Sequence, residues 1–207
     1  MIRRTSLLVT AFSLLLGCSR PAAVESNPPV SSLSSATPAA VPTAPSAAPT
    51  VSAASAEPAA TLLAVGTEVP DVSALAQDGK TVRLRALKGK PVIVYFYPKD
   101  DTTGCTIEAK GIRDQYKDLD SRATVLGVST DTQDSHKAFA DKYSLPFKLL
   151  DDSSHTLVTA FGVPVSSGHA KRVTFVIDKD GKVSKVFPNV NPSGHAEELL
   201  EALKALG

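Results

Sequence analysis

The sequence predicts an α/β sandwich, with a central mixed β-sheet covered by helices, in residues 62–207 of the 207-residue chain. Three observations support this prediction. A fully apolar run of six residues at 92–97 is typical of a strand that is buried on both faces. The segment that follows it has helical periodicity. Strand-like and helix-like segments then alternate along the chain, which is the order of an α/β domain.

Two segments precede this domain. Residues 1–17 combine a basic start with an apolar run too short to span a bilayer, as in a signal peptide. The sequence LLGC that ends at Cys18 resembles the lipobox, at which a bacterial signal is removed and the cysteine becomes lipidated. An ordinary secretory signal with an incidental cysteine is the alternative. Residues 18–61 are rich in Ala, Pro and Ser and indicate a disordered tether or a glycosylated stalk.

The charge of the domain limits the classes of partner that it can be expected to bind. It carries 19 basic and 19 acidic residues and no basic run, which argues against nucleic acid or anionic lipid as a partner of the domain. The four histidines of the chain show no metal-ligand spacing. The turn from Asp178 to Gly181 lacks the remaining ligand positions of a calcium loop. We therefore expect neither a metal nor a cofactor.

The individual elements follow from periodicity and from turn and capping residues. Besides the strand at 92–97, the expected strands are a hairpin at 71–84 that turns at Asp78-Gly79, single strands at 123–129 and 147–150, and a hairpin of 172–177 and 182–187. The expected helices begin at Cys105, span 131–143 and 155–161, and include a last helix capped by Ser193. The helix at 131–143 is expected to be capped by Asp131 or Thr132 and to have Ser135, Phe139 and Tyr143 on one face. Asp100 and Asp101 are expected in a solvated loop. This order is that of the thioredoxin fold with an added N-terminal hairpin.

Cys105 lies where the buried central strand gives way to the next helix. The residues that share its helix face are Cys105, Ala109, Ile112, Tyr116 and Leu119. The unpaired N–H groups and the positive dipole end of a helix N-terminus stabilise a thiolate over a thiol. If Cys18 is lipidated, Cys105 is the one thiol left in the mature chain. It is therefore the candidate nucleophile, and a buried core cysteine is the alternative.

The residues around Cys105 resemble the peroxiredoxin signature, in which a proline, a threonine and a cysteine are set four and three residues apart. Here they are Pro98, Thr102 and Cys105. The longer segment YFYPKDDTTGCTIEAKGIRD is similar to the bacterioferritin-comigratory-protein (PrxQ) subfamily, as are RVTFVIDKDGKV and NPSGHAEELLEAL. The resemblance implies a thiol-dependent peroxidase that reduces hydrogen peroxide and organic hydroperoxides through a sulfenic acid on Cys105.

The chemistry of that reaction gives roles to neighbouring residues. Arg172, if it folds across from Cys105, and N–H groups at the helix start could stabilise the oxygen that leaves with negative charge. An exposed salt bridge is the alternative role for Arg172. The Thr102 hydroxyl can accept and donate at once, so it can bridge thiolate and peroxide. Pro98 has no N–H and would shield the sulfur from solvent and over-oxidation.

Two positions depart from the family pattern. Many relatives carry a second cysteine five residues after the first, where this chain has Lys110, and Thr103 replaces the usual proline. No later cysteine exists in the chain, so an intramolecular disulfide of the domain cannot form. We therefore expect a one-cysteine mechanism that is resolved by an external thiol, either a thioredoxin-like protein or a small thiol.

These features predict a lipid-anchored, extracytoplasmic or periplasmic peroxidase of the bacterial cell envelope, present as a monomer or weak dimer. Ser19 after Cys18 favours the outer membrane, where the organism has one. Two rival functions stay open. One is another thioredoxin-fold role, a disulfide oxidoreductase or copper-handling lipoprotein, which the lack of a CxxC or CxxxC pair weakens. The other is a non-enzymatic envelope lipoprotein that uses the fold as a binding module.

Overall fold

The structure is a computed structural model that describes residues 61–206. Its elements are β1 (Ser73–Ala76), β2 (Thr81–Arg83), the 3-10 helix η1 (Leu84–Leu87), β3 (Val92–Phe96), α1 (Thr103–Asp114), α2 (Tyr116–Arg122), β4 (Thr124–Ser129), α3 (Gln133–Tyr143), β5 (Lys148–Asp151), α4 (Thr156–Phe161), β6 (Val165–Ser166), β7 (His169–Ala170), β8 (Val173–Ile177), β9 (Val183–Phe187) and α5 (His195–Lys204). The predicted signal peptide, Cys18 and tether up to residue 60 lie outside the described residues. None of the helices within residues 61–206 has the length and hydrophobicity of a membrane span.

The main sheet is built around β3. Its seven strands have the order β2-β1-β5-β4-β3-β8-β9. β3 pairs in parallel with β4 and antiparallel with β8, so the sheet is mixed, as predicted. All five residues of β3 are buried, because its side chains enter two cores alternately. Val92 and Phe96 belong to one core, and Ile93 and Tyr95 belong to the other.

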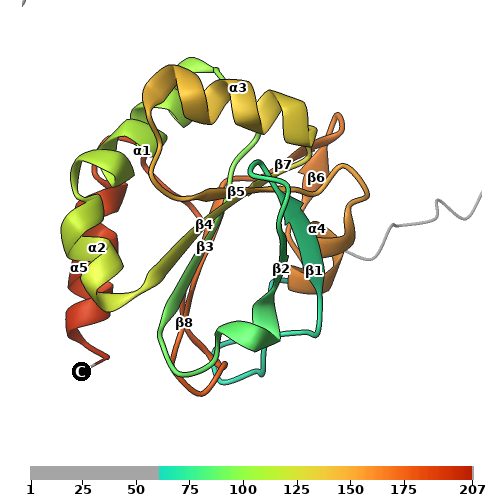
Figure 1. Cartoon of the computed structure of the whole chain (residues 1–207). Helices are drawn as coiled ribbons and strands as arrows, with labels where there is room; N and C mark the ends of the chain where they lie inside the picture. Colours follow the sequence, from blue (N-terminus) through green and yellow to red (C-terminus); the bar gives the residue numbers. More distant parts are fainter. Residues whose placement is uncertain (1–60, 207) are drawn as a thin grey trace, which may run out of the picture. The chain divides into compact units, whose positions relative to one another are not determined.

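Helices cover both faces of the sheet. Figure 1 shows α1, α2, α3 and α5 together on one side of it and α4 on the other. The core beneath the larger group contains Ile112, Leu119, Phe139 and Leu199. The core on the α4 side contains Phe161, which packs against the phenylalanine of β3 with ring centroids 5.4 Å apart. The predicted α/β sandwich with a central mixed sheet and its N-terminal β1–β2 hairpin are therefore present.

The predicted helix after β3 differs from the structure in its bounds. It begins at Thr103, two residues before Cys105, and a break at Gln115 divides it into α1 and α2. Gln115 has φ −104° and ψ 11°, outside the helical region, although its N–H still bonds to the carbonyl of Gly111. The apolar period continues through this break, because Leu119 of α2 is buried in the same core as Cys105.

Two helix details were predicted incompletely. The Thr132 cap of α3 is confirmed, since its hydroxyl accepts the Ser135 N–H at 3.5 Å. The buried face of α3, however, consists of His136, Phe139 and Ala140, and Ser135 lies at its edge. Phe139 and Tyr143 pack against the core as predicted, but the predicted face omitted His136, because a polar residue gives no sign in the sequence that it belongs to the core.

The predicted Ser193 cap is wrong. α5 begins at His195 after Gly194, and no side chain caps it. The Ser193 N–H instead donates to the side chain of Asn191 at 3.2 Å, in a turn that precedes the helix. The β6–β7 hairpin was not predicted, because two-residue strands leave no alternation to detect. The Thr130 hydroxyl donates to the carbonyl of Gly168 at 2.9 Å and ties this hairpin to the end of β4.

Candidate active site

Cys105 lies in the first turn of α1 and is 2% exposed. Thr102, the N-cap residue, has an extended backbone, and its carbonyl accepts the Thr106 N–H at 2.9 Å. The first N–H groups of a helix have no intrahelical partner. Cys105 therefore lies at the helix start, as the sequence predicted, and its side chain is buried as well.

Arg172 reaches the sulfur from the neighbouring strand. β8 is antiparallel to β3, with Val173 opposite Phe96, so the residue before Val173 lies beside the end of β3 from which α1 departs. The Arg172 Nη2 group donates to the Cys105 Sγ at 3.3 Å. A side chain on Gly104 would lie 3.3 Å from the same nitrogen, so the glycine leaves room for the guanidinium. The sequence-based expectation that Arg172 folds beside Cys105 is met.

Glu108 completes this arrangement. It is three residues after Cys105 on α1, its side chain is fully buried, and its carboxylate forms an ion pair with Nη1 of Arg172. Burial raises the pKa of Glu108 to about 7, although the charge of Arg172 acts in the opposite direction. Burial lowers the pKa of Arg172, but Glu108 and Cys105 raise it more strongly, so the guanidinium stays charged.

A buried histidine lies behind Glu108. The His195 Nε2 atom is 2.8 Å from the Thr174 hydroxyl and 3.9 Å from the Glu108 Oε1 atom. Its Nδ1 atom faces the Glu198 carboxylate at 3.3 Å. Burial lowers the pKa of His195, against the opposing effect of Glu198. Among the described residues, Oε1 of Glu108 has no hydrogen-bond partner, so the second oxygen of this carboxylate is poorly satisfied.

Pro98 and Thr102 lie on the loop between β3 and α1. Pro98 is half-buried and Thr102 is exposed. The Thr102 hydroxyl donates to the Lys99 carbonyl at 3.1 Å, which leaves its oxygen as an acceptor. The loop therefore brings a hydroxyl to the helix start, three residues before Cys105.

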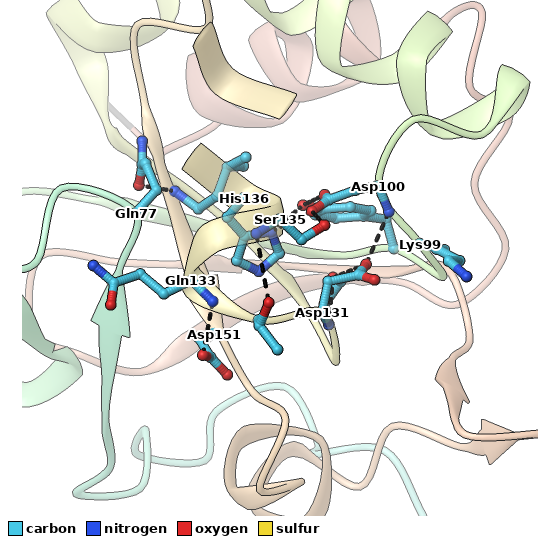
Figure 2. A network of polar contacts seen from close by, with 12 residues as sticks. Gln77, Lys99, Asp100, Asp131, Gln133, Ser135, His136 and Asp151 are labelled. Carbon is cyan, nitrogen blue, oxygen red and sulfur yellow. Dashed lines mark hydrogen bonds and ion pairs between the residues drawn. The ribbon is translucent and has the colours of Figure 1, made fainter. Parts of the chain in front are cut away.

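Asp100 in the same loop is not solvated, contrary to the prediction. It is 7% exposed and takes part in the polar network of Figure 2. The hydroxyl groups of Tyr97 and Ser135 donate to its carboxylate, each at 2.7 Å, and the His136 ring lies 2.8 Å from it. Asp101 follows the prediction, because it is exposed.

Comparisons with known proteins agree on one family. The pattern of the AhpC/TSA family matches residues 65–186. Peroxiredoxin Bcp of Bacillus subtilis is 40% identical over 148 residues, which span 68% of this chain and 94% of that protein. The chloroplast peroxiredoxin Q of Sedum lineare is 43% identical over 145 residues, 68% of this chain and 78% of its own. The crystal structure of peroxidoxin BcpB from Mycobacterium tuberculosis has a TM-score of 0.65 and 36% identity, covering 69% of this chain and 97% of that one.

The chain belongs to the AhpC/TSA family. It is a peroxiredoxin of the PrxQ/Bcp group and therefore a thiol-dependent peroxidase, an oxidoreductase. The predicted thioredoxin-like fold of this peroxiredoxin is confirmed as well, by the sheet and by the relatives of known structure. Within residues 61–206, no group of three His, Cys, Asp or Glu side chains could hold a metal ion.

Sequence reasoning missed two acidic residues of this peroxiredoxin. Glu108 could have been found, because residues three apart on a helix share a face and Cys105 lies on the buried face of α1. Asp100 offered no comparable signal. Its partners Ser135 and His136 lie 35 and 36 residues away on another helix, and only the tertiary structure brings them together.

The raised pKa of Glu108 predicts a pH effect on stability. Between the ordinary value of 4.5 and about 7, the folded peroxiredoxin keeps a proton on Glu108 that the unfolded chain has released. The free energy of unfolding of the wild type should therefore fall as pH rises through this window, by at most about 3 kcal/mol. Glu108→Gln, which cannot ionise, should lack that fall. Urea unfolding between pH 4.5 and 7.5 measures it, with the exposed Glu201→Gln as the matched control, and parallel curves for wild type and Glu108→Gln would contradict the prediction.

Proposed function

We propose that this peroxiredoxin is a one-cysteine enzyme that reduces hydrogen peroxide and organic hydroperoxides and depends on an external thiol. The observation that carries the proposal is the buried Cys105 sulfur at a helix start, 3.3 Å from the Arg172 guanidinium, in a domain without another cysteine. The family relatives support peroxide chemistry rather than a binding module or a copper-handling role.

In the proposed oxidation step, the Cys105 thiolate attacks one peroxide oxygen. A sulfur–oxygen bond forms as the oxygen–oxygen bond breaks, and sulfur supplies the two electrons. The other oxygen leaves as hydroxide or alkoxide and takes a proton to become water or an alcohol, while Cys105 becomes a sulfenic acid. Arg172 and the N–H groups at the start of α1 stabilise the developing charge, because they are fixed before the reaction begins.

We assign supporting roles to two loop residues. The Thr102 hydroxyl donates a hydrogen bond to the Lys99 carbonyl. Its oxygen can therefore accept a hydrogen bond from the hydroperoxide. A rotation of the hydroxyl would let it donate to the peroxide oxygen under attack instead. Pro98 contributes a half-buried ring without an N–H donor and limits the water that reaches the sulfur.

The reduction step needs two external thiol groups. The first condenses with the sulfenic acid to give a mixed disulfide and water. The second attacks this mixed disulfide, which releases Cys105 as a thiol and joins the two external sulfurs in a disulfide. Lys110, at the position of the second cysteine in many relatives, is exposed on α1 and offers no sulfur. Because Cys105 is 2% exposed, the first turn of α1 must move for an external thiol to reach it.

We also propose that the enzyme works at the bacterial cell envelope, outside the cytoplasm. The support is the sequence alone: an apolar segment at 7–16, the LLGC sequence ending at Cys18, and the Ala/Pro/Ser-rich residues up to 61. In this proposal, lipid on Cys18 anchors the chain, with the outer membrane favoured by Ser19. Residues 18–61 then act as a tether for the peroxidase domain.

The proposed function is tested by adding one equivalent of hydrogen peroxide to the fully reduced chain with a sulfenic-acid trap present. Cys18 is replaced by serine throughout, so that Cys105 is the one thiol of the chain. We expect the trap to label Cys105 at one per chain, and stopped-flow traces to show oxidation orders of magnitude faster than that of free cysteine. Cys105→Ser should show no labelling. Labelling of the wild type no faster than that of free cysteine would contradict the proposed function.

The role of Thr102 is tested with a matched pair of substitutions. Thr102→Val keeps the shape of the side chain but removes the hydroxyl, and it should slow Cys105 oxidation by about 100-fold with an unchanged melting temperature. Thr102→Ser keeps the hydroxyl and should stay within a few-fold of the wild type. If Thr102→Val reacts at the rate of Thr102→Ser, the hydroxyl has no part in the reaction.

A further inference from the structure

The loop between β3 and α1 is joined to α3 and, through it, to β5 by the buried network around Asp100. We propose that Asp100 and His136 are a positioning pair, which holds the start of α1 in the geometry needed for peroxide attack on Cys105. This inference depends on the proposed function, because it concerns the rate of that attack. Neither residue touches the sulfur or the expected place of the peroxide, so neither is a catalytic residue.

The Asp100 carboxylate has a fixed direction. One oxygen accepts from the Tyr97 hydroxyl at 2.7 Å, and the other accepts from the Ser135 hydroxyl at 2.7 Å and contacts Nδ1 of His136 at 2.8 Å. The side chain is 5% exposed. Partners directly after β3 and on α3 therefore hold one loop residue from two directions, and Figure 2 shows Ser135 and His136 beside Asp100.

His136 extends this connection to the centre of the sheet. Its side chain is fully buried, and its Nε2 atom lies 3.1 Å from the Leu150 carbonyl of β5. Because a carbonyl only accepts, Nε2 must carry a hydrogen. The ring thus spans the space between the loop and a central strand, and its orientation is set at both nitrogens. The rigidity of the sheet is transmitted to the loop through this ring.

The backbone of the loop is held in the same place. The Asp100 N–H donates to the Asp131 carboxylate at 2.8 Å, and that carboxylate also accepts from the Ser129 hydroxyl at 2.7 Å. Asp101 has a left-handed backbone with φ 57°, a conformation that is costly for a residue with a side chain. Its carboxylate is held by Lys142 and by the Tyr143 hydroxyl at 2.6 Å. The two residues immediately before Thr102 are therefore fixed by α3 and β4.

This placement matters because the two halves of the site come from different elements. Cys105 belongs to α1, whereas Arg172 precedes β8, and the 3.3 Å contact between them requires α1 to start at one position relative to the sheet. A misplacement of 1 Å can cost about 100-fold in rate. A buried carboxylate and imidazole seldom stabilise a fold more than apolar residues of the same size. Their hydrogen bonds do, however, fix direction, which apolar contacts do not.

The test compares Asp100→Ala with Asp178→Ala. Asp178 also accepts two hydrogen bonds, from the Asp180 and Lys182 N–H groups at 2.9 Å each, but it follows β8 at the end of the sheet opposite to Arg172. We expect Asp100→Ala to slow the oxidation of Cys105 by hydrogen peroxide by about 10- to 100-fold, without slowing its alkylation by iodoacetamide. In Asp178→Ala, Cys105 should be oxidised at a rate within about two-fold of the wild type, even if this substitution lowers the melting temperature as much as Asp100→Ala does.

Two further variants separate positioning from general stability. Asp100→Asn can still accept from Tyr97 and donate to His136, so it should restore most of the rate. His136→Ala should slow oxidation as Asp100→Ala does, and the double variant should be no slower than either single one, because the pair acts as a unit. If Asp100→Ala does not fold, Ser135→Ala removes a single donor and should slow oxidation a few-fold.

The inference fails if Asp100→Ala oxidises at the wild-type rate, if Asp178→Ala is slowed equally, or if the effects of Asp100→Ala and His136→Ala simply multiply. Rapid oxidation of the wild-type chain leaves the proposed function standing in each of these cases. Slow oxidation of the wild type itself removes the proposed function instead, so the two failures are distinguishable.

Discussion

The Arg172 guanidinium, which bridges the Cys105 sulfur and the Glu108 carboxylate, is the contact on which the rest of the site depends. Three groups that can carry charge lie together in an interior where isolated charges are costly. Among residues 61–206, Arg172 is the one cation that contacts both of the others, and its planar fork lets two nitrogens point at two partners. The positions of the Cys105 sulfur and the Glu108 carboxylate relative to each other are therefore set by the Arg172 guanidinium.

Two elements of the fold, α1 and β8, bring the three residues of this contact together. α1 presents Cys105 and Glu108 on one face, three residues apart, and β8 brings Arg172 because it runs antiparallel beside β3. Glycines leave room for the larger side chains of the site. Gly104 leaves room for Arg172, and a side chain on Gly127 would lie 2.7 Å from the Tyr95 ring that packs beneath α1. The start of α1 is fixed from the opposite side through Asp100, so the sulfur lies between two independently anchored elements.

The fold was largely predictable because its signals are local. The apolar run of β3, the periodicity after it and the turn residues of the hairpins lie within short stretches, and the structure shows each of them. Cys105 at a helix start was predictable for the same reason. The place of Arg172 was only a conditional expectation, because no spacing in the sequence shows that β8 pairs with β3. Its contact with the sulfur follows from that pairing.

The parts that could not be predicted involve polar residues with distant partners. Asp100 looks like a loop residue until α3 packs against β3, and His136 looks like a surface residue until its ring meets the carbonyl of β5. The break at Gln115 leaves the apolar period intact, so the pattern gives no sign of it. The cap of α5 was predicted at Ser193 because capping preferences are local, whereas Ser193 lies in the turn at Asn191 and the helix begins two residues later, at His195.

The most direct test of the fork is the rate of Cys105 oxidation in Arg172→Lys, measured by stopped-flow with hydrogen peroxide in excess. Lysine keeps the positive charge but lacks the planar fork, so it cannot reproduce the contacts that two separate nitrogens make with Cys105 and Glu108. We predict a fall of at least about 10-fold, with the fold intact by circular dichroism. Oxidation of Arg172→Lys at the wild-type rate would show that a nearby positive charge is enough, and the bridging geometry would then not be the basis of reactivity.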